Sequence, residues 1–311
     1  MEGPGDAVRR SAVFGDADLP KLFQFADSAA VSRQQYTLHS ARRQLVLLVA
    51  AAAFSALPWR LTARHIDFFA LLSALLYVAA LVFVWQAARH RHKVHWQLHR
   101  TAAEFLRSQC WSYAVCGAPF DSGAPDPEGL FAVKANDVLG RLRAIGWRDP
   151  RPPGTSFADP DLVTRSMREL RAKALTVRRE VYVRDRVMEQ RDWYHRRAQE
   201  SRRAALLWSA VTVSATVAAL AGALANAFEW GTSMDVVGLA SAAAASSVAW
   251  TELRQYQPLV AAHSLVAQEL SGMAVTLAKV TSPQGWAAEV ETAEAVISPD
   301  HTAWLARHGG R

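Results

Sequence analysis

Three histidines in the stretch ARHRHKVHW are the first residues whose chemistry could hold a metal ion: His90, His92 and His95. Residues three apart share a face of a helix, so His92 and His95 would point the same way and His90 would not. The neighbouring Arg89, Arg91 and Lys93 would also repel a cation. We expect instead a basic collar at a lipid surface, where each Lys or Arg contributes about 1 kcal/mol beside anionic headgroups.

Motifs that would support an enzyme are missing from the sequence. It has neither a phosphate-binding GxxxxGK[ST] loop nor a GxGxxG turn, and neither a GxSxG nor an HExxH motif. Its two cysteines, Cys110 and Cys116, are too few for a disulfide framework or a four-ligand zinc site, and they indicate a reduced, cytosolic setting. We therefore expect no catalytic residue, no cofactor and no metal.

The stretch QRDWYHRRAQESRRAALLW, residues 190–208, places arginines and an aromatic pair directly before an apolar run. It could be a basic helix that binds nucleic acid or the cytoplasmic end of a membrane helix, and the net charge of +7 suits either anionic partner. A surface for nucleic acid needs a basic face free of acids, whereas Asp185, Glu189, Asp192 and Glu200 interrupt this one. We expect a lipid bilayer and no nucleic acid as the partner.

Small and polar residues also recur at helical spacing inside the apolar runs. They are Ser209, Thr212, Thr216 and Asn226 in one run and Gly238, Ser241 and Ala245 in the next. Small residues let two helices approach closely, so these faces suit tight helix packing. They equally suit a water-filled pathway between subunits of an oligomer, where weak hydrophobicity has no cost. The sequence leaves both interpretations open.

Four apolar runs must position these side chains: residues 44–59, 66–85, 204–228 and 236–250. A spanning helix needs roughly 20 residues, so the second and third runs are long enough and the first and fourth are short. Tryptophans lie near the ends of the runs, as interfacial side chains do, whereas a soluble bundle would scatter them: Trp59, Trp85, Trp208, Trp230 and Trp250. The pattern predicts an all-α membrane protein with two transmembrane hairpins and long cytosolic helices.

Basic residues predict how the hairpins are oriented. They flank the runs on one side: Arg42, Arg43, Arg89, Arg91, Arg196, Arg197, Arg202 and Arg203. The loop EWGTSMD of the second hairpin has no Lys or Arg, and the loop of the first hairpin has Arg60 and Arg64, which are outnumbered by the basic residues on the opposite side. Both chain ends are therefore expected in the cytoplasm. The first 20 residues lack the apolar core of a secretory signal, and membrane insertion would rely on the internal runs.

The remaining segments read as helices between proline- and glycine-rich loops. We expect a flexible segment over residues 1–26, a first hairpin domain over 27–150 and a second over 151–306. Within them we expect a helix over 130–145, one long helix or two in near succession over 161–221, and two helices after the fourth run. The tail from Gly285 to Asp300 carries Glu289, Glu291, Glu294 and Asp300 without a base. It should lie on the basic stalk, residues 161–203, through exposed, individually weak ion pairs.

The motifs YVRDRVMEQRDWYHRRA before the second hairpin, and YQPLVAAHSLVAQEL and VETAEAVISPDHTAW after it, resemble the SLATT domain, a SMODS- and SLOG-associating two-transmembrane effector. The first half, with LHRTAAEFLRSQCWSYAVCGAPF, resembles a second, divergent copy. The resemblance implies a homo-oligomeric effector of bacterial conflict systems that breaches the inner membrane when a nucleotide-derived signal or a neighbouring sensor protein reports phage attack. It supplies no catalytic residues, and a non-conducting scaffold or sensor is the alternative.

Overall fold

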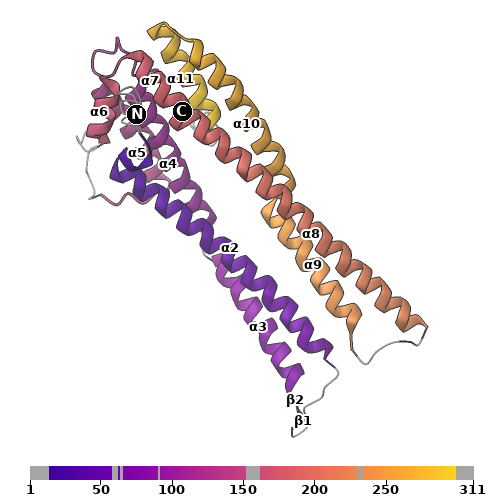
Figure 1. The fold of residues 1–311 in the computed structure, drawn as a ribbon. Coiled ribbons are helices and arrows are strands. Elements are labelled where there is room, and N and C mark those ends of the chain that lie inside the picture. The colour runs from indigo at the N-terminus through magenta and orange to yellow at the C-terminus, as the bar shows by residue number, and fades with distance from the viewer. Residues whose placement is uncertain are drawn as a thin grey trace, which may run out of the picture. The chain divides into compact units, whose positions relative to one another are not determined.

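The computed structural model describes residues 14–57, 62–63, 66–89, 92–151, 162–228, 230 and 234–298. The chain divides into two compact units, each built from separate stretches of sequence (Figure 1). The core unit comprises Met1–Arg33, Lys93–Arg196 and His263–Arg311, and the hairpin unit comprises Gln34–His92 and Arg197–Ala262.

The described chain is almost entirely helical, as predicted, apart from one two-residue β-ladder. In order, its elements are the 3-10 helix η1 (Asp16–Asp18), α2 (Lys21–Ala56), β1 (Thr62–Ala63), β2 (Ile66–Asp67), α3 (Phe68–Arg89), α4 (His92–Val115), α5 (Pro127–Ala144), α6 (Arg165–Arg171), α7 (Leu175–Tyr182), the π-helix η3 (Val183–Met188), α8 (Glu189–Ala227), α9 (Val236–Arg254), α10 (Tyr256–Lys279) and α11 (Pro283–Ile297). β1 and β2 pair antiparallel, with Ala63 opposite Ile66.

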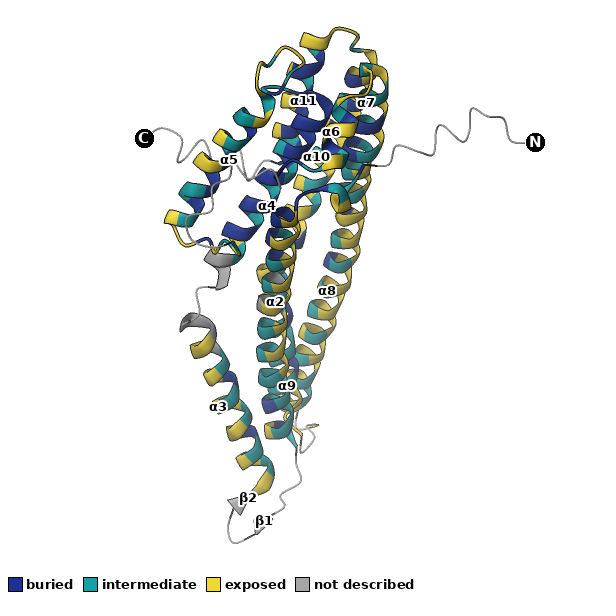
Figure 2. Cartoon of the chain, turned by 90° about the vertical axis from the view of Figure 1, so that its left-hand side faces the viewer, coloured by how far each residue is buried: buried dark blue, intermediate teal, exposed yellow. Residues whose placement is uncertain are grey.

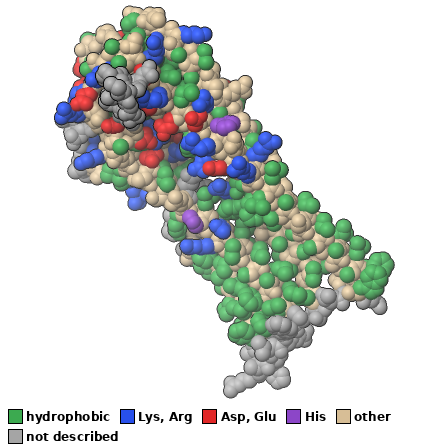
Figure 3. All heavy atoms as spheres, in the orientation of Figure 1, with side chains coloured by type: hydrophobic (Ala, Val, Ile, Leu, Met, Phe, Trp, Pro, Cys, Tyr) green, Lys and Arg blue, Asp and Glu red, His purple; other side chains and the backbone are tan. Residues whose placement is uncertain are grey.

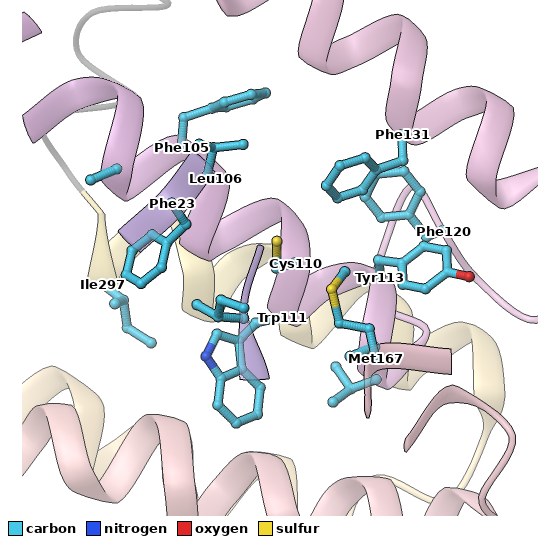
Figure 4. Close-up of a cluster of buried hydrophobic side chains, with 14 of the residues drawn as sticks. Phe23, Phe105, Leu106, Cys110, Trp111, Tyr113, Phe120, Phe131, Met167 and Ile297 are labelled. Atoms are coloured by element: carbon cyan, nitrogen blue, oxygen red, sulfur yellow. The ribbon is translucent and has the colours of Figure 1, made fainter. Parts of the chain in front are cut away.

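The core unit is held together by apolar side chains from helices far apart in sequence (Figure 4). Leu106 of α4, Leu142 of α5, Met167 of α6 and Val290 of α11 are each 0% exposed. In α4 most residues from Leu98 onward are buried, and every residue from Cys110 to Val115 is buried, so other core elements surround this part of the helix. The core therefore closes only when segments from both halves of the chain are present.

Residues 14–26 pack into this core and differ from the flexible segment expected over residues 1–26. Phe14, Leu19 and Phe23 are buried, and the Phe14 ring meets the Trp111 ring edge-on at 4.8 Å. These few apolar residues lie among glycines and charged residues, so the sequence shows no periodic pattern that would predict their burial. Residues 1–13 lie outside the described part of the chain.

The expected stalk over residues 161–221 is a short helix followed by a very long one. α6 begins after Thr164, whose hydroxyl accepts a hydrogen bond from the Met167 amide, and it ends at Arg171. A continuous helix of 53 residues, Leu175–Ala227, then joins α7, η3 and α8. The helices predicted near residues 130–145 and after the fourth apolar run are confirmed as α5, α10 and α11.

The hairpin unit contains α3, α9 and the apolar parts of α2 and α8. In the first hairpin, the Ser73 hydroxyl donates to the Ala51 carbonyl at 2.8 Å, and Phe54 stacks on Phe69. The second hairpin pairs α8 with α9. The Asp235 amide donates to the Ala56 carbonyl at 3.3 Å, which brings the end of α2 to the start of α9.

A candidate membrane-spanning unit

Among the described residues, two helices are long and apolar enough to cross a membrane: Leu175–Ala227 and Val236–Lys279. Only 6% and 11% of their most apolar windows are buried inside the chain, which is not the burial of a soluble core helix. Figure 2 shows α8, α9 and α3 as largely exposed or half-buried, and Figure 3 shows hydrophobic side chains covering the visible face of the hairpin unit. The fold leaves this apolar surface without a protein partner within the described residues.

Four membrane spans were expected, but neither helix of the first hairpin has an apolar stretch long enough to count as a span. The apolar helix Phe68–Phe83 is shorter than a spanning window, and α2 is apolar only near its end. The fourth run, expected to be marginal alone, belongs to the longer helical stretch Val236–Lys279. Gln255, with φ of 48°, marks the junction of α9 and α10 inside that stretch.

A small polar contact joins α8 to α9. The hydroxyls of Thr212 and Ser247 lie 2.8 Å apart, and the Ser247 hydroxyl also donates to the Trp208 carbonyl. Nearby, Gly222 lies so close to α9 that a Cβ atom there would sit 3.2 Å from Val237 Cγ2. Ser247 is 2% exposed. Its burial does not follow from the local sequence, because its position on the packed face depends on the register between the two helices.

The other residues of the predicted pathway or packing face are placed differently. Thr212 packs between the helices, and the Gly238 amide donates to the Asp235 carboxylate at the start of α9. The remaining five are exposed on the surface of the hairpin unit: Ser209, Thr216, Asn226, Ser241 and Ala245. The structure therefore separates a packed Thr212–Ser247 contact from an exposed polar and small-residue surface.

Aromatic residues gather at the base of the second hairpin. The Trp208 and Trp250 rings lie 6.1 Å apart, and Trp250 Nε1 donates to the Tyr256 hydroxyl at 3.2 Å. Trp85 is 53% exposed and Trp230 is 79% exposed, so neither side chain is packed in a protein core. Trp59 lies outside the described residues.

The basic residues expected to orient the hairpins are mostly exposed. Arg42, Arg43, Arg196, Arg202 and Arg203 are all exposed. Arg197 is also exposed and forms an ion pair with Glu200 at 2.8 Å. The described part of the chain does not include Arg91 or the side chain of Arg89. It also does not include the side chains of His90, His92 and His95, so the possible metal site at these histidines stays untested. Among the described residues no group of three His, Cys, Asp or Glu side chains could hold a metal ion.

The acidic tail helix does lie on the stalk, but its main contact is buried rather than exposed. Arg186 of η3 and Glu294 of α11 are 3% and 4% exposed, and two hydrogen bonds of 2.9 and 2.7 Å join them. The Tyr182 hydroxyl donates to the same carboxylate at 3.0 Å. The expectation of exposed tail pairs is wrong for Glu294, because α11 turns that residue into the aromatic core.

This contact changes the proton affinities of its members. Burial raises the pKa of Tyr182 well above its ordinary value, and the Glu294 carboxylate acts in the same direction. Burial alone would lower the pKa of Arg186, but the Glu294 carboxylate outweighs it, so the pKa of Arg186 is raised. The guanidinium and the phenol therefore keep their protons throughout the neutral range.

Two long apolar helices that the fold leaves exposed are typical of the class of membrane proteins. A family model described as SMODS and SLOG-associating 2TM effector domain 3 matches residues 20–179, and one described as domain 1 matches residues 182–304. The chain therefore belongs to the SLATT family and carries two SLATT domains in tandem. It is a membrane-associated effector of conflict systems. No curated protein and no solved structure matches it.

The two matched domains do not coincide with the two compact units. Each match contributes one hairpin to the hairpin unit and flanking helices to the core unit. The first supplies α4, α5 and α6 to the core, and the second supplies η3, α11 and parts of α8 and α10. The tandem copies thus share one hydrophobic core.

Proposed function

We propose that the protein assembles into a homo-oligomer in the bacterial inner membrane and forms a regulated pore that depolarises the cell. Both hairpins span the bilayer, and both chain ends lie in the cytoplasm. A nucleotide-linked signal or a partner sensor protein acts on the core unit and opens the pore. The proposal rests on the family membership and on the surface of the hairpin unit.

The observation that carries the pore is a set of unsatisfied polar groups on that surface. Ser209 and Asn226 of α8 and Ser241 of α9 are exposed, and none forms a hydrogen bond with the described part of the chain. Facing lipid, each such group would cost on the order of several kcal/mol. A second copy of the chain or a water-filled pathway would satisfy them, and an oligomeric pore supplies both.

The link between the hairpins supports four spans rather than two. Because the Asp235 amide bonds to the Ala56 carbonyl, the end of α2 lies at the same depth as the start of α9. A second hairpin that crosses the bilayer therefore carries the tip of the first hairpin across as well. A short first span can be accommodated when the bilayer thins locally or when flanking Lys and Arg side chains snorkel to the interface.

A route for the signal is built into one helix. The stretch Leu175–Ala227 begins in the core unit and ends in the hairpin unit without a break. Its π-helical segment carries Arg186, which holds α11 through Glu294. π-helical turns are frequent at functional sites, so a signal that shifts α11 would reach the apolar part of α8 through this helix.

Depolarisation of living cells tests the proposal. The full-length protein is induced in bacteria loaded with a potential-sensitive dye, with and without its genomic neighbours, and purified protein is reconstituted into dye-loaded vesicles. We expect loss of the membrane potential under activating conditions. Failure to depolarise under every condition tried would overturn the pore.

Matched substitutions separate a pore from a scaffold. The polar groups are removed by three substitutions: Ser209→Leu, Asn226→Leu and Ser241→Leu. The control is Val217→Leu, which changes an apolar residue of α8 that is 58% exposed. At equal expression in the membrane, the first three should abolish depolarisation and the control should retain it. Equal depolarisation by all four variants would show that these polar groups do not line the conducting path, whereas no depolarisation by the unchanged protein would favour the non-conducting scaffold.

A further inference from the structure

Five arginines of the hairpin unit form no ion pair or hydrogen bond with the described part of the chain. They are Arg42, Arg43, Arg202, Arg203 and Arg254. Arginines of the core unit behave differently, since Arg107, Arg168 and Arg186, among others, each pair with a carboxylate. A guanidinium is always charged at neutral pH, so groups other than the described carboxylates balance these five charges.

Arg254 is held in a defined position. Its guanidinium carbon lies 5.9 Å from the centre of the Trp250 ring and 5.4 Å from the centre of the Tyr256 ring. The hydrogen bond from Trp250 Nε1 to the Tyr256 hydroxyl fixes these two rings relative to each other. The Arg254 Nε atom is buried and has no hydrogen-bond partner in the described chain. The aromatic rings thus orient a cation whose terminal Nη atoms remain available, whereas its Nε atom does not.

The other two arginines of the second hairpin lie at the same level. Thr212 contacts Ser247, and Trp208 contacts Trp250, so α8 and α9 run antiparallel in a fixed register. Continuing that register by one turn places Arg254 opposite the turn of α8 that follows Arg202 and Arg203.

Apolar side chains border these three arginines. Leu206, Leu207 and Leu253 are 65%, 63% and 41% exposed beside them. Glu252 is also exposed there, but it forms no ion pair with Arg254 within the described residues. The second hairpin therefore has a basic rim at the edge of its apolar surface, with tryptophans at the same depth.

We infer that Arg254, together with Arg202 and Arg203, binds the phosphate of an anionic phospholipid headgroup. The inference rests on the membrane location given in the proposed function. A guanidinium binds phosphate through two parallel hydrogen bonds, and tryptophan rings prefer the headgroup level of a bilayer. Three positive charges exceed the single negative charge of one phosphate, so the site favours a lipid whose headgroup has a net negative charge. In phosphatidylcholine, the arginines would repel the ammonium group. Arg42 and Arg43 provide the corresponding unpaired cations of the first hairpin.

Titration of the purified full-length protein in neutral detergent with short-chain lipids tests this site. The probes are dioctanoyl phosphatidylglycerol, dioctanoyl phosphatidylcholine and inorganic phosphate, and the readout is the shift of the melting temperature with concentration. We expect phosphatidylglycerol to bind more tightly than phosphatidylcholine. Arg254→Gln should weaken it about tenfold, and Arg202→Gln or Arg203→Gln about fivefold each.

Arg197→Gln is the matched control, because Arg197 belongs to α8 but pairs with Glu200. It should bind phosphatidylglycerol like the unchanged protein, and Arg254→Lys should bind with intermediate affinity. The melting temperature without lipid shows whether each variant folds. Equal binding of both lipids, or unchanged binding by Arg254→Gln, would overturn the site, and equally tight binding of inorganic phosphate would reassign it to free anions. Failure of the protein to enter detergent micelles or bilayers would instead contradict the proposed function.

Discussion

Arg186 and Glu294 are 108 residues apart in the sequence and form a doubly hydrogen-bonded ion pair in the core, with 2.7 Å between Arg186 Nη2 and Glu294 Oε2. Tyr182, one turn before Arg186, donates to the same carboxylate, and its ring lies edge-on between Trp111 and Trp286. Arg186 belongs to the helix that continues into α8, whereas Glu294 belongs to the final helix. The pair therefore fixes α11 onto the stalk.

Removing the carboxylate should strongly destabilise the protein. Glu294→Leu leaves the Arg186 guanidinium buried without a counter-charge, which typically costs about 3–5 kcal/mol. Thermal unfolding of the full-length protein in detergent, followed by circular dichroism, measures the effect. Glu291→Leu is the control, because Glu291 is exposed on the same helix.

A second set of variants separates the charge from the packing. Combining Glu294→Leu with Arg186→Met and Tyr182→Phe replaces the polar cluster by apolar side chains, and such replacements of buried ion pairs are often neutral or stabilising. We expect the triple variant to regain most of the lost stability. An unfolding temperature as low as that of Glu294→Leu alone would show that shape, and not the uncompensated charge, dominates.

The sequence predicts the helices better than it predicts this pair. Proline and glycine mark the breaks, and apolar periodicity marks the buried faces, so α5, α10 and α11 follow from local pattern. Glu294 looked like one acidic residue among several on an exposed tail. Its burial depends on Tyr182 and Arg186, and no local pattern reveals a partner more than 100 residues away.

The predicted polar face differs from the observed packed face because a local pattern does not reveal which residues meet another helix. Helical spacing places Thr212 on a stripe of α8, but it cannot decide which side of that stripe meets α9. The burial of Ser247 follows from its contact with Thr212 across the two helices, which no pattern within α9 reveals. Phe14 was overlooked because a single aromatic among polar residues carries no periodicity.

Tyr113 should make the stability of the core unit sensitive to alkaline pH. Burial, assisted by the charge of the nearby Glu128 carboxylate, raises the pKa of Tyr113 from 10.0 to about 12. Because the folded state holds this proton more tightly than the unfolded state, the stabilisation is complete below about pH 10 and is lost as the pH rises towards 12. The unfolding temperature should fall more steeply over this interval than it does in Tyr113→Phe.

Absorbance of tyrosinate gives an independent measure of this titration. The unchanged protein should show one tyrosine ionising near pH 12 that is missing from Tyr113→Phe. Stability curves of the two proteins that run parallel between pH 10 and pH 12 would contradict the assignment.

Gly222 should tolerate alanine but not a large side chain. A Cβ atom there would lie 3.2 Å from Val237 Cγ2 and 3.5 Å from Val236 Cγ1, so only a small adjustment of these valines is needed for Gly222→Ala. Gly222→Leu would force α8 and α9 apart and should cost about 1–3 kcal/mol. Ala218→Leu, one turn earlier on the exposed face, is the control for added bulk without overpacking. Equal stability of the two leucine variants in detergent unfolding would show that the helices do not pack closely at Gly222.

The hydroxyl contact between Thr212 and Ser247 should contribute measurable coupling between α8 and α9. Thr212→Val and Ser247→Ala each remove one hydroxyl of the 2.8 Å contact, and hydrogen bonds between membrane helices average about 0.6 kcal/mol with a maximum near 1.7 kcal/mol. Both hydroxyls also donate to the Trp208 carbonyl, so a double-mutant cycle of unfolding free energies in detergent is needed to isolate the pairwise part. Thr216→Val is the control, since its hydroxyl bonds only to the Thr212 carbonyl of its own helix. Additive effects of the two substitutions would mean that each hydroxyl serves its neighbouring backbone and that van der Waals packing around Gly222 alone holds the hairpin closed.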